Sequence, residues 1–425
     1  MSSSLSERDK KIIWHPYTQQ KNMADPLPLV RGEGALLYDE AGKAYIDASS
    51  SWWVNIHGHA HPYIAEKIYR QALQLEHVIF AGYTHEPAVT LAERLLPLLP
   101  GDFRRAFYSD NGSTAVEVAL KMSIQYWWNK GVKRHKLLAF RHSYHGDTFG
   151  AMSVSERSVF TTAFRDYLFE VVFIDTPTAE NMADVAAQIH LHGPETAAFI
   201  YEPLLQGAGG MRMYDAALLD TLLQACRSEG ILCIADEVMT GFGRTGKLFA
   251  GEYMAAKADI ICLSKGITGG TMALGFTACT DALYQAFVDD DKMKTLFHGH
   301  SFTANPLTCA AALASLDLLL DPACAEARAR INRQHIAFAE TQRPHPMVKD
   351  LRVLGTVLAF DVETTGKDGY LNNVGPEIAR FSLQRGIMLR PMGNNVYVLP
   401  PYCITEEELE KIYSCISDVL DKLSA

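Results

Sequence analysis

The sequence contains no long run of charge of either sign. Its 39 lysine and arginine residues are outnumbered by 49 aspartate and glutamate residues, so the formal net charge is −10. A protein that binds nucleic acid needs a basic stripe to neutralise the phosphates. The sequence therefore argues against a nucleic-acid partner.

Long apolar runs are also lacking. The first residues, Met-Ser-Ser-Ser-Leu-Ser-Glu-Arg-Asp-Lys-Lys, contain no apolar core of a signal peptide, and no segment is long enough to span a bilayer. These absences predict a cytoplasmic protein that has no membrane partner.

Paired cysteines, repeats and low-complexity tracts are missing as well. The eight cysteines are scattered without a C-x-x-C motif, and several lie inside apolar segments. Such a distribution is typical of buried free thiols. With 425 residues, of which 48% are apolar and 21% charged, the chain has the composition of a globular protein. It is long enough for two or three domains and a large core.

Two short apolar segments lead into side chains that can carry chemistry. Residues 231–235 precede Asp236, and residues 260–263 lead through Ser264 into Lys265. Such runs are typical of buried parallel strands, whose carboxyl ends border the ligand crevice of an open α/β sheet. A lysine in an apolar site forms Schiff bases with carbonyl compounds, and a buried acid keeps a pyridine nitrogen protonated. Because pyridoxal phosphate needs both, the sequence predicts this cofactor.

The glycine-rich segment after Asp236 allows an alternative. Residues 241–247 fit the G-x-x-x-x-G-K part of a P-loop, which would indicate a nucleotide hydrolase. Position 248 is leucine, however, where a P-loop needs a hydroxyl that ligates the metal ion. The acid also precedes the loop by only a few residues, and no separate strand leads into the glycines. The P-loop hydrolase is therefore the less favoured hypothesis.

Strand-like and helical patterns alternate along much of the chain. Strand-like runs occur at residues 106–109, 137–140, 171–174, 197–201, 231–235, 260–263 and 274–279. With helical segments between several of them, this order predicts an α/β protein with a mostly parallel central sheet covered on both faces.

The ends of the chain differ from this pattern. Residues 34–39 and 43–47 alternate as in a small antiparallel sheet. Beyond about residue 325 a helix precedes strands such as 353–360 and 396–399. A capping box formed by Thr405 and Glu408 predicts the start of the last helix.

Two polar segments are candidates for binding a phosphate. Residues 110–114 lie between a strand-like run and a helical pattern, with Ser113 or Thr114 as the expected N-cap. Free N–H groups and the helix dipole would favour an anion there, although an ordinary capped helix has the same pattern. The loop of residues 298–303 can supply further N–H groups and a hydroxyl.

Several other residues have two interpretations each. Trp52 and Trp53 can be core residues or an aromatic wall for a long apolar substrate. Tyr144, just past a strand, can lie on the face of an aromatic cofactor or be an interior phenol. Arg390 in an apolar context can bind a substrate carboxylate or form a structural salt bridge.

Three histidines at positions 57, 59 and 61 alternate as metal ligands in a strand would. No further cluster of His, Cys or acidic residues completes a first coordination shell. The spacing therefore favours a turn with hydrogen-bonded histidines, and we predict no metal site.

The segment from Asp236 to Lys247, together with Ser264-Lys265-Gly266, resembles the signature of the class III aminotransferases, which are fold type I pyridoxal phosphate enzymes. The resemblance covers essentially the whole chain. It implies a homodimer with active sites shared across the interface. It also implies a large cofactor-binding domain at residues 61–324 and a smaller α+β domain built from residues 1–60 and 325–425.

The resemblance implies roles for individual side chains. Lys265 would hold the cofactor covalently and then carry the proton during transfer, and Asp236 would keep the pyridine nitrogen protonated. Tyr17 is the third residue expected to act in catalysis. The residues expected to bind the cofactor are Gly112, Ser113, Tyr144, Asp236 and Lys265, with the partner's His300 and the partner's Ser301. The residues expected to form the substrate pocket are Tyr17, Trp52, Trp53, Tyr144, Asp147, Arg390 and Tyr397, with the partner's Gly299.

Flanking motifs are similar to those of the branch of this family that acts in biotin synthesis. They are His15-Pro16-Tyr17-Thr18, residues 50–53, 144–153 and 206–214, and Arg390-Pro391 with residues 400–402. The resemblance implies a ping-pong transfer from S-adenosylmethionine to 8-amino-7-oxononanoate, which gives 7,8-diaminononanoate, with Arg390 on the acceptor's carboxylate.

Two alternatives within the family remain open. Lysine can replace S-adenosylmethionine as the donor in some relatives, although residues 206–214 favour S-adenosylmethionine. The chain could also be another ω-amino acid aminotransferase. Met239 speaks against the ornithine and γ-aminobutyrate enzymes, which have a glutamine at this position.

Overall fold

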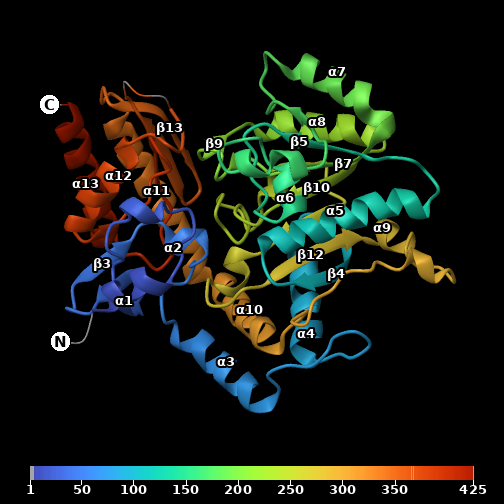
Figure 1. Ribbon diagram of the computed structural model, residues 1–425, viewed down its shortest axis with the longest axis horizontal. Coiled ribbons are helices and arrows are strands. Elements are labelled where there is room, and N and C mark those ends of the chain that lie inside the picture. The colour runs from blue at the N-terminus through green and yellow to red at the C-terminus, as the bar shows by residue number, and fades with distance from the viewer. Residues whose placement is uncertain (1–3, 365, 367, 425) are drawn as a thin grey trace.

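A seven-stranded sheet forms the centre of the computed structural model, which describes residues 4–364, 366 and 368–424 (Figure 1). The strands lie in the order β4-β12-β11-β10-β7-β5-β6, and β12 alone runs antiparallel to its neighbours. This arrangement confirms the predicted α/β fold with a mostly parallel sheet. The bounds of the strands are β4 Phe103–Ser109, β5 Lys136–Phe140, β6 Val172–Ile174, β7 Thr196–Tyr201, β10 Leu232–Asp236, β11 Ile260–Leu263 and β12 Gly275–Thr280.

Both faces of this sheet are buried, because alternate residues of a strand point to opposite faces. In β10, Cys233 and Ala235 pack in one apolar cluster with α8 (Ala216–Ser228), whereas Ile234 packs in a second cluster with α5 (Gly112–Asn129). The strand therefore reads as a continuous apolar run, and its first charged residue comes at its carboxyl end.

The other helices between residues 62 and 319 surround the seven-stranded sheet and its edge (Figure 1). The helix α10 packs against α3 and α4 and against the short 3-10 helix that begins at Lys265. The bounds are α3 Pro62–Gln74, α4 Glu86–Leu95, α6 Phe149–Val154, α7 Met182–His192, α9 Asp281–Gln285 and α10 Pro306–Leu319.

Segments from the two ends of the chain meet beside the large sheet (Figure 1). The short strand β15 (Ile387–Met388) pairs in parallel with β3 (Ala44–Asp47) and so extends the N-terminal sheet, which has the order β1-β2-β3-β15. A second sheet has the order β13-β14-β16. The other bounds are β1 Leu29–Glu33, β2 Leu36–Asp39, β13 Val348–Leu354, β14 Val357–Val362, β16 Asn395–Val398, α1 Leu5–Ile12, α11 Pro322–Gln342, α12 Val374–Gln384 and α13 Glu406–Ser424. The domain boundaries at residues 60 and 324 stay predictions.

Three local expectations need correction. The run predicted as one strand at residues 353–360 is a hairpin, because the chain turns at Gly355, whose φ is +57°, between β13 and β14. The N-cap of α5 is Asn111, whose side chain accepts the N–H of Thr114, rather than Ser113 or Thr114. Cys403 is exposed, in contrast to the buried thiols that were expected.

The shortest elements are a two-stranded ladder, a left-handed turn and several 3-10 helices. The ladder pairs β8 (Leu205–Gln206) with β9 (Arg212–Met213). The turn α2 (Ser50–Trp53) has positive φ at all four residues. No single helix in the described part of the chain is both long and apolar enough to cross a membrane; α10 and α11 meet the two conditions only as a pair bent by 69°.

Candidate active site

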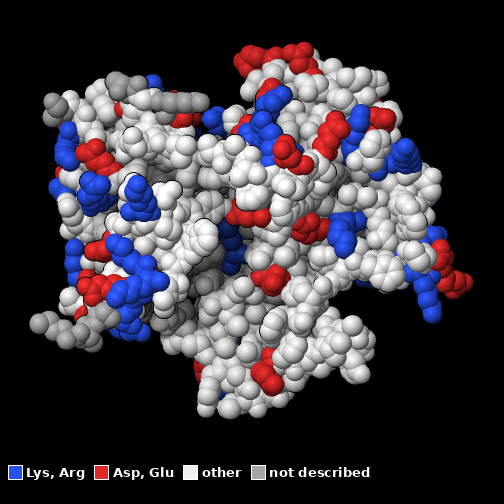
Figure 2. Space-filling view, viewed as in Figure 1, with Lys and Arg blue, Asp and Glu red and all other residues white. Residues whose placement is uncertain are grey.

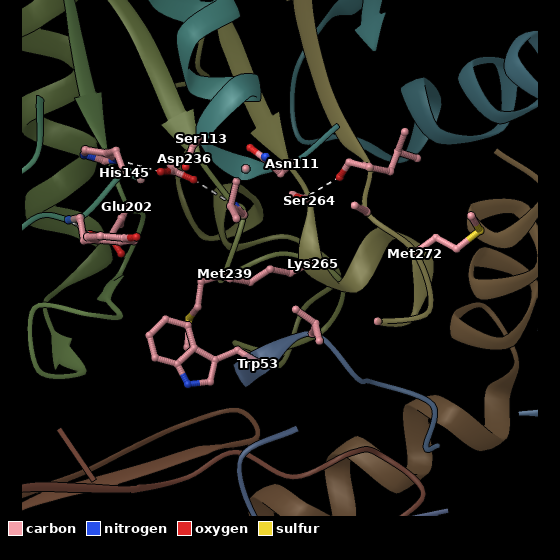
Figure 3. Close-up of a pocket in the computed structure, with 18 of the residues that line it drawn as sticks. Trp53, Asn111, Ser113, His145, Glu202, Asp236, Met239, Ser264, Lys265 and Met272 are labelled. Atoms are coloured by element: carbon pink, nitrogen blue, oxygen red, sulfur yellow. Dashed lines mark hydrogen bonds and ion pairs between the residues drawn. The ribbon is translucent and has the colours of Figure 1, made fainter. Parts of the chain in front are cut away.

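Asp236 and Lys265 lie at the carboxyl ends of neighbouring strands. In the parallel pair β10·β11, Asp236 stands opposite Cys262, and Lys265 follows three residues later in the chain. Both side chains are brought to one cavity of about 410 Å³ (Figure 3). The two charged residues predicted to face a single ligand therefore do line a common space.

Lys265 is held under strain and away from water. Its φ is +47°, a left-handed conformation that costs free energy in any residue other than glycine. Burial lowers the pKa of its amine to about 8, against the opposing effect of the Asp236 and Glu202 carboxylates. Its Nζ lies 4.7 Å from the centre of the Trp53 ring. A neutral amine, which can act as a nucleophile, is thus accessible near physiological pH.

A buried histidine holds the carboxylate of Asp236. His145 Nδ1 lies 2.6 Å from Asp236 Oδ2, and the His145 side chain is fully buried. In Figure 3 Lys265 lies between this pair and Trp53. The remaining oxygen, Asp236 Oδ1, accepts the N–H of Val238 at 3.1 Å. These bonds fix the carboxylate at the edge of the cavity.

A second buried acid, Glu202, lines the same cavity. It follows β7, the strand next to β10, and its carboxylate accepts the N–H groups of Tyr144 and Gly207 at 3.0 and 2.9 Å. Burial raises the pKa of Glu202 to about 7, while the nearby His145 lowers it and Asp236 raises it. Glu202 thereby fixes the backbone that carries Tyr144 into the cavity.

The start of α5 borders the cavity opposite the lysine loop. Gly112 packs so closely that an added Cβ would lie 2.7 Å from Val238, and both residues line the cavity with Ser113. The N–H groups of Gly112 and Ser113 have no intrahelical acceptor because they open the helix. Gly146, with φ +133°, brings the N–H of Asp147 to 3.2 Å from Ser113 Oγ. These donors can bind an anion.

A second cavity of about 380 Å³ adjoins the first and has aromatic walls. Lys265, Trp53 and Tyr144 line both cavities. The second also brings together the predicted pocket residues Tyr17, Trp52, Arg390 and Tyr397. The guanidinium of Arg390 lies 3.9 Å from the centre of the Trp52 ring. The two basic side chains of this cavity, Arg390 and Lys265, therefore each lie over the ring of a different tryptophan.

Tyr17, which lines this space, meets Asp147, which lines a neighbouring cavity instead. The Tyr17 hydroxyl donates to Asp147 and lies 3.3 Å from the hydroxyl of Tyr144. Burial and the hydrogen bond to Asp147 raise the pKa of Tyr17 to about 12. Burial raises the pKa of Tyr144 further, so both phenols keep their protons as donors.

Figure 2 shows a hollow between the part of the molecule that contains the large sheet and the part built from the two ends of the chain. Basic side chains lie inside this hollow.

Gly299, His300 and Ser301 line neither cavity. They form a turn in which the hydroxyl of Thr303 donates to the carbonyl of His300 at 2.9 Å. Phe297 and Phe302, which flank this turn, are 67% and 62% exposed. The contact of the loop with a partner's cofactor stays a prediction.

The P-loop interpretation is wrong. After β10 the segment 241–247 does not open an α-helix but runs through turns into the short 3-10 helix Ala250–Tyr253. The Nζ of Lys247 donates to the carbonyl of Glu252 rather than pointing at a cradle of N–H groups. In residues 4–364, 366 and 368–424, no group of three or more His, Cys, Asp or Glu side chains could hold a metal ion.

Sequence reasoning missed three buried residues near the site. His145 and Glu202 were given no role, although Glu202 follows a strand as Asp236 does, and this signal could have found it. Arg244 lies in the P-loop-like segment and in the aminotransferase signature, but neither pattern gives it a role of its own. It is 1% exposed, and its guanidinium donates to the carbonyls of Pro400 and Trp53 at 2.9 and 3.4 Å. Its charge also contributes to the lowered pKa of Lys265.

Residues 17–420 match the family described as Aminotransferase class-III, and the chain belongs to this family of enzymes, as the resemblance predicted. It is similar to a protein of Synechococcus elongatus named adenosylmethionine-8-amino-7-oxononanoate aminotransferase, with 48% identity over 97% of this chain and 99% of that protein.

Solved structures agree with this assignment. The crystal structure of adenosylmethionine-8-amino-7-oxononanoate aminotransferase from Methanocaldococcus jannaschii is 35% identical, has a TM-score of 0.93, and covers 97% of this chain and 98% of that one. A PLP-bound amine transaminase from an uncultivated Pseudomonas species is 29% identical with a TM-score of 0.90, and the coverage is again 97% and 98%. The similarity therefore extends over the whole transaminase fold.

Proposed function

We propose that this aminotransferase moves the amino group of S-adenosylmethionine to 8-amino-7-oxononanoate and forms 7,8-diaminononanoate for biotin synthesis, with pyridoxal phosphate as its cofactor. The observation that carries the proposal is the aromatic cavity, which places Arg390 beside Trp52 and Lys265 beside Trp53. An acceptor with a long aliphatic chain and one terminal carboxylate matches apolar walls and a single guanidinium.

The residues of the first cavity fit pyridoxal phosphate. A buried lysine with a lowered pKa can form a Schiff base with the aldehyde of the cofactor. A carboxylate fixed by His145 can keep the ring nitrogen of the cofactor protonated. The first-turn N–H groups of Gly112 and Ser113 suit a phosphate, and Tyr144 offers a flat apolar face. When bound, this cofactor supplies an electron sink for the bond that breaks at the amino-bearing carbon.

The chain's own residues would carry the proton and orient the substrates. Lys265 Nζ would take a proton from the amino-bearing carbon of the donor and deliver it within the same half-reaction, and it would run this transfer in reverse on the acceptor. It is assigned this role because it is the titratable amine that lines both cavities. The hydroxyls of Tyr17 and Tyr144 keep their protons and can donate to polar groups of the substrate. Arg390 would bind the acceptor's carboxylate.

We further propose a homodimer that acts in the cytoplasm. Support for the dimer comes from the loop of Gly299, His300 and Ser301, which lines neither of the two cavities described above and is flanked by exposed phenylalanines.

The test separates the donor from the acceptor by following each half-reaction. Purified protein loaded with pyridoxal phosphate is mixed with S-adenosylmethionine, lysine, ornithine or γ-aminobutyrate, and the visible absorbance of the cofactor is recorded. We expect S-adenosylmethionine to abolish that absorbance and 8-amino-7-oxononanoate to restore it. Lys265→Ala should show neither change. A response to lysine alone would reassign the donor, and a response to ornithine or γ-aminobutyrate alone would contradict the proposal.

A further inference from the structure

The two tryptophans of the substrate cavity are carried by a left-handed turn. Ser50, Ser51, Trp52 and Trp53 have φ values of +49°, +45°, +71° and +73°. Each of these residues has a Cβ that approaches the following carbonyl oxygen in this conformation, so each one costs free energy. Four such residues in a row persist only where the surroundings hold them.

The turn has a consequence for the cavity. In an extended strand, adjacent residues point to opposite faces, so one of two neighbouring tryptophans would leave the cavity. Here Trp52 and Trp53 both line it, and their rings contact Arg390 and Lys265 respectively. The strained backbone is therefore what allows consecutive indoles to serve one space.

A single buried carboxylate gathers the polar groups around the turn. Asp47 is 0% exposed. Its Oδ1 accepts the N–H of Ser49 at 3.1 Å, and its Oδ2 accepts the hydroxyl of Ser51 at 2.7 Å. Burial alone would raise the pKa of Asp47, but hydrogen bonds from His59 and Ser51 outweigh it and lower the pKa. The carboxylate thus binds the residue before the turn and the second residue within it.

His59 completes this arrangement from the other side. Its Nε2 lies 3.0 Å from Asp47 Oδ2, and its Nδ1 lies 3.1 Å from the side-chain nitrogen of Asn55. The amide of Asn55 is oriented by its oxygen, which accepts the N–H of Gly58 at 2.8 Å. Asn55 therefore donates to Nδ1, which leaves the ring hydrogen on Nε2 to be donated to Asp47. Gly32 makes room for this ring, since an added Cβ there would lie 2.5 Å from the Cβ of His59.

We propose that Asp47 and His59 are positioning residues that hold the left-handed turn and thereby set both tryptophans of the substrate cavity. Neither side chain lines the cavity itself. Asp47 bonds the turn directly through Ser51, and His59, oriented by Asn55, holds the Asp47 carboxylate in place. Together these hydrogen bonds offset the strain of four left-handed residues. Asp47 and His59 thus determine the shape of the cavity. Only the identity of the substrate that fits this shape rests on the proposed function.

The test uses the full-length protein labelled with fluorotryptophan, in which the five tryptophans give separate fluorine NMR signals. Trp52→Phe and Trp53→Phe assign the two signals of the turn. We expect Asp47→Asn and His59→Leu to shift or broaden these two signals, while those of Trp14, Trp127 and Trp128 stay in place.

Two further variants separate positioning from general damage. His59→Gln keeps an N–H donor near the position of Nε2, so its two turn signals should lie closer to those of the wild type than the His59→Leu signals do. Asp39→Asn is the matched control, because Asp39 accepts N–H groups of Ala41 and Lys43 at the end of β2, away from the turn. It should leave all five signals unchanged.

The outcomes decide the proposal without any substrate. Unmoved signals of Trp52 and Trp53 in folded Asp47→Asn or His59→Leu protein would overturn it, and so would an equal movement of all five. If Asp47→Asn does not fold, the comparison of His59→Leu with His59→Gln gives the same decision. The proposed function is tested separately, by steady-state kinetics of the same variants. Because each loses one hydrogen bond to a charged group, its KM for 8-amino-7-oxononanoate should rise roughly tenfold while kcat changes less. A wild-type protein that does not use this acceptor would contradict the proposed function and leave the NMR result standing.

Discussion

Lys265 combines burial, backbone strain and a neighbouring carboxylate in one residue. Burial is the largest effect on its pKa, and Asp236 works against it. A protonated amine cannot attack a carbonyl group, so the position of this balance decides the pH at which the residue reacts. The same environment that makes the lysine costly to bury makes it reactive.

The first prediction concerns the pH dependence of this amine. In cofactor-free protein the neutral fraction of Lys265 should rise as the pH passes through about 8, because burial lowers the pKa of its amine. Competitive chemical labelling across a pH series, quantified by mass spectrometry of the peptide that contains Lys265, measures the midpoint. Asp236→Asn should lower the midpoint further, since it removes a charge that raises the pKa. A midpoint at the ordinary lysine value of 10.5 would contradict the prediction.

Single residues of the site could be predicted where a strand delivers them. Asp236 follows its apolar run directly and Lys265 follows its own after one serine, and the edge of a parallel sheet gathers such residues. His145 could not be assigned in this way, because its role depends on a contact with a residue 91 positions away in the chain. The hydrogen bond between Tyr17 and Asp147, 130 positions apart, is equally invisible in the sequence.

At the scale of elements, the large sheet was predictable and the local caps and turns were less so. Period and length identify β10 and β11, since a strand buried on both faces is a short apolar run. The same rule joined β13 and β14 into one strand, because apolar residues continue across the turn at Gly355. The turn α2 was not predictable, because nothing in Ser-Ser-Trp-Trp favours a left-handed backbone; distant contacts such as the hydrogen bond from Ser50 to the Leu399 carbonyl support it.

The second prediction concerns the cap of α5. Asn111 forms a capping box with Thr114, with bonds of 2.9 and 3.1 Å in the two directions. Asn111→Ala should lower the free energy of unfolding by about 1 kcal/mol. It should also weaken the binding of pyridoxal phosphate, because Gly112 and Ser113 follow the cap directly. Urea unfolding and equilibrium binding measure the two effects.

Asp215→Ala supplies the matched control for this cap. Asp215 caps α8 by accepting the N–H groups of Ala217 and Leu218, and it lines neither cavity. The loss of stability should be similar and the cofactor affinity unchanged. Equal losses of affinity in both variants would show that α5 has no special part in holding the phosphate.

At the scale of the whole molecule, a single chain brings most of the predicted site residues to its two cavities. The predicted residues of the loop 299–301 are among the exceptions. The seven-stranded sheet carries the lysine and the acid, and the segments from both termini supply Tyr17, Trp52 and Arg390 to the shared hollow. The loop of Gly299, His300 and Ser301 lies at neither cavity. In a symmetric dimer whose interface includes this loop, both loops would reach the partner's site, since a two-fold axis makes every contact twice.

The last prediction tests whether the loop acts on the partner's site. One chain carries Lys265→Ala and an intact loop, and the other carries Lys265 with His300→Ala and Ser301→Ala. Homodimers of the first chain lack the amine, and homodimers of the second lack the loop donors, so both should bind pyridoxal phosphate poorly. In a mixed dimer, the site with Lys265 receives the intact loop from its partner only if the loop works across the interface. Tight binding should then return at one of the two sites, as measured by titration of the mixed protein purified with two different tags. If the loop served its own chain instead, every site of the mixed dimer would lack either the amine or the donors, and mixing would restore nothing.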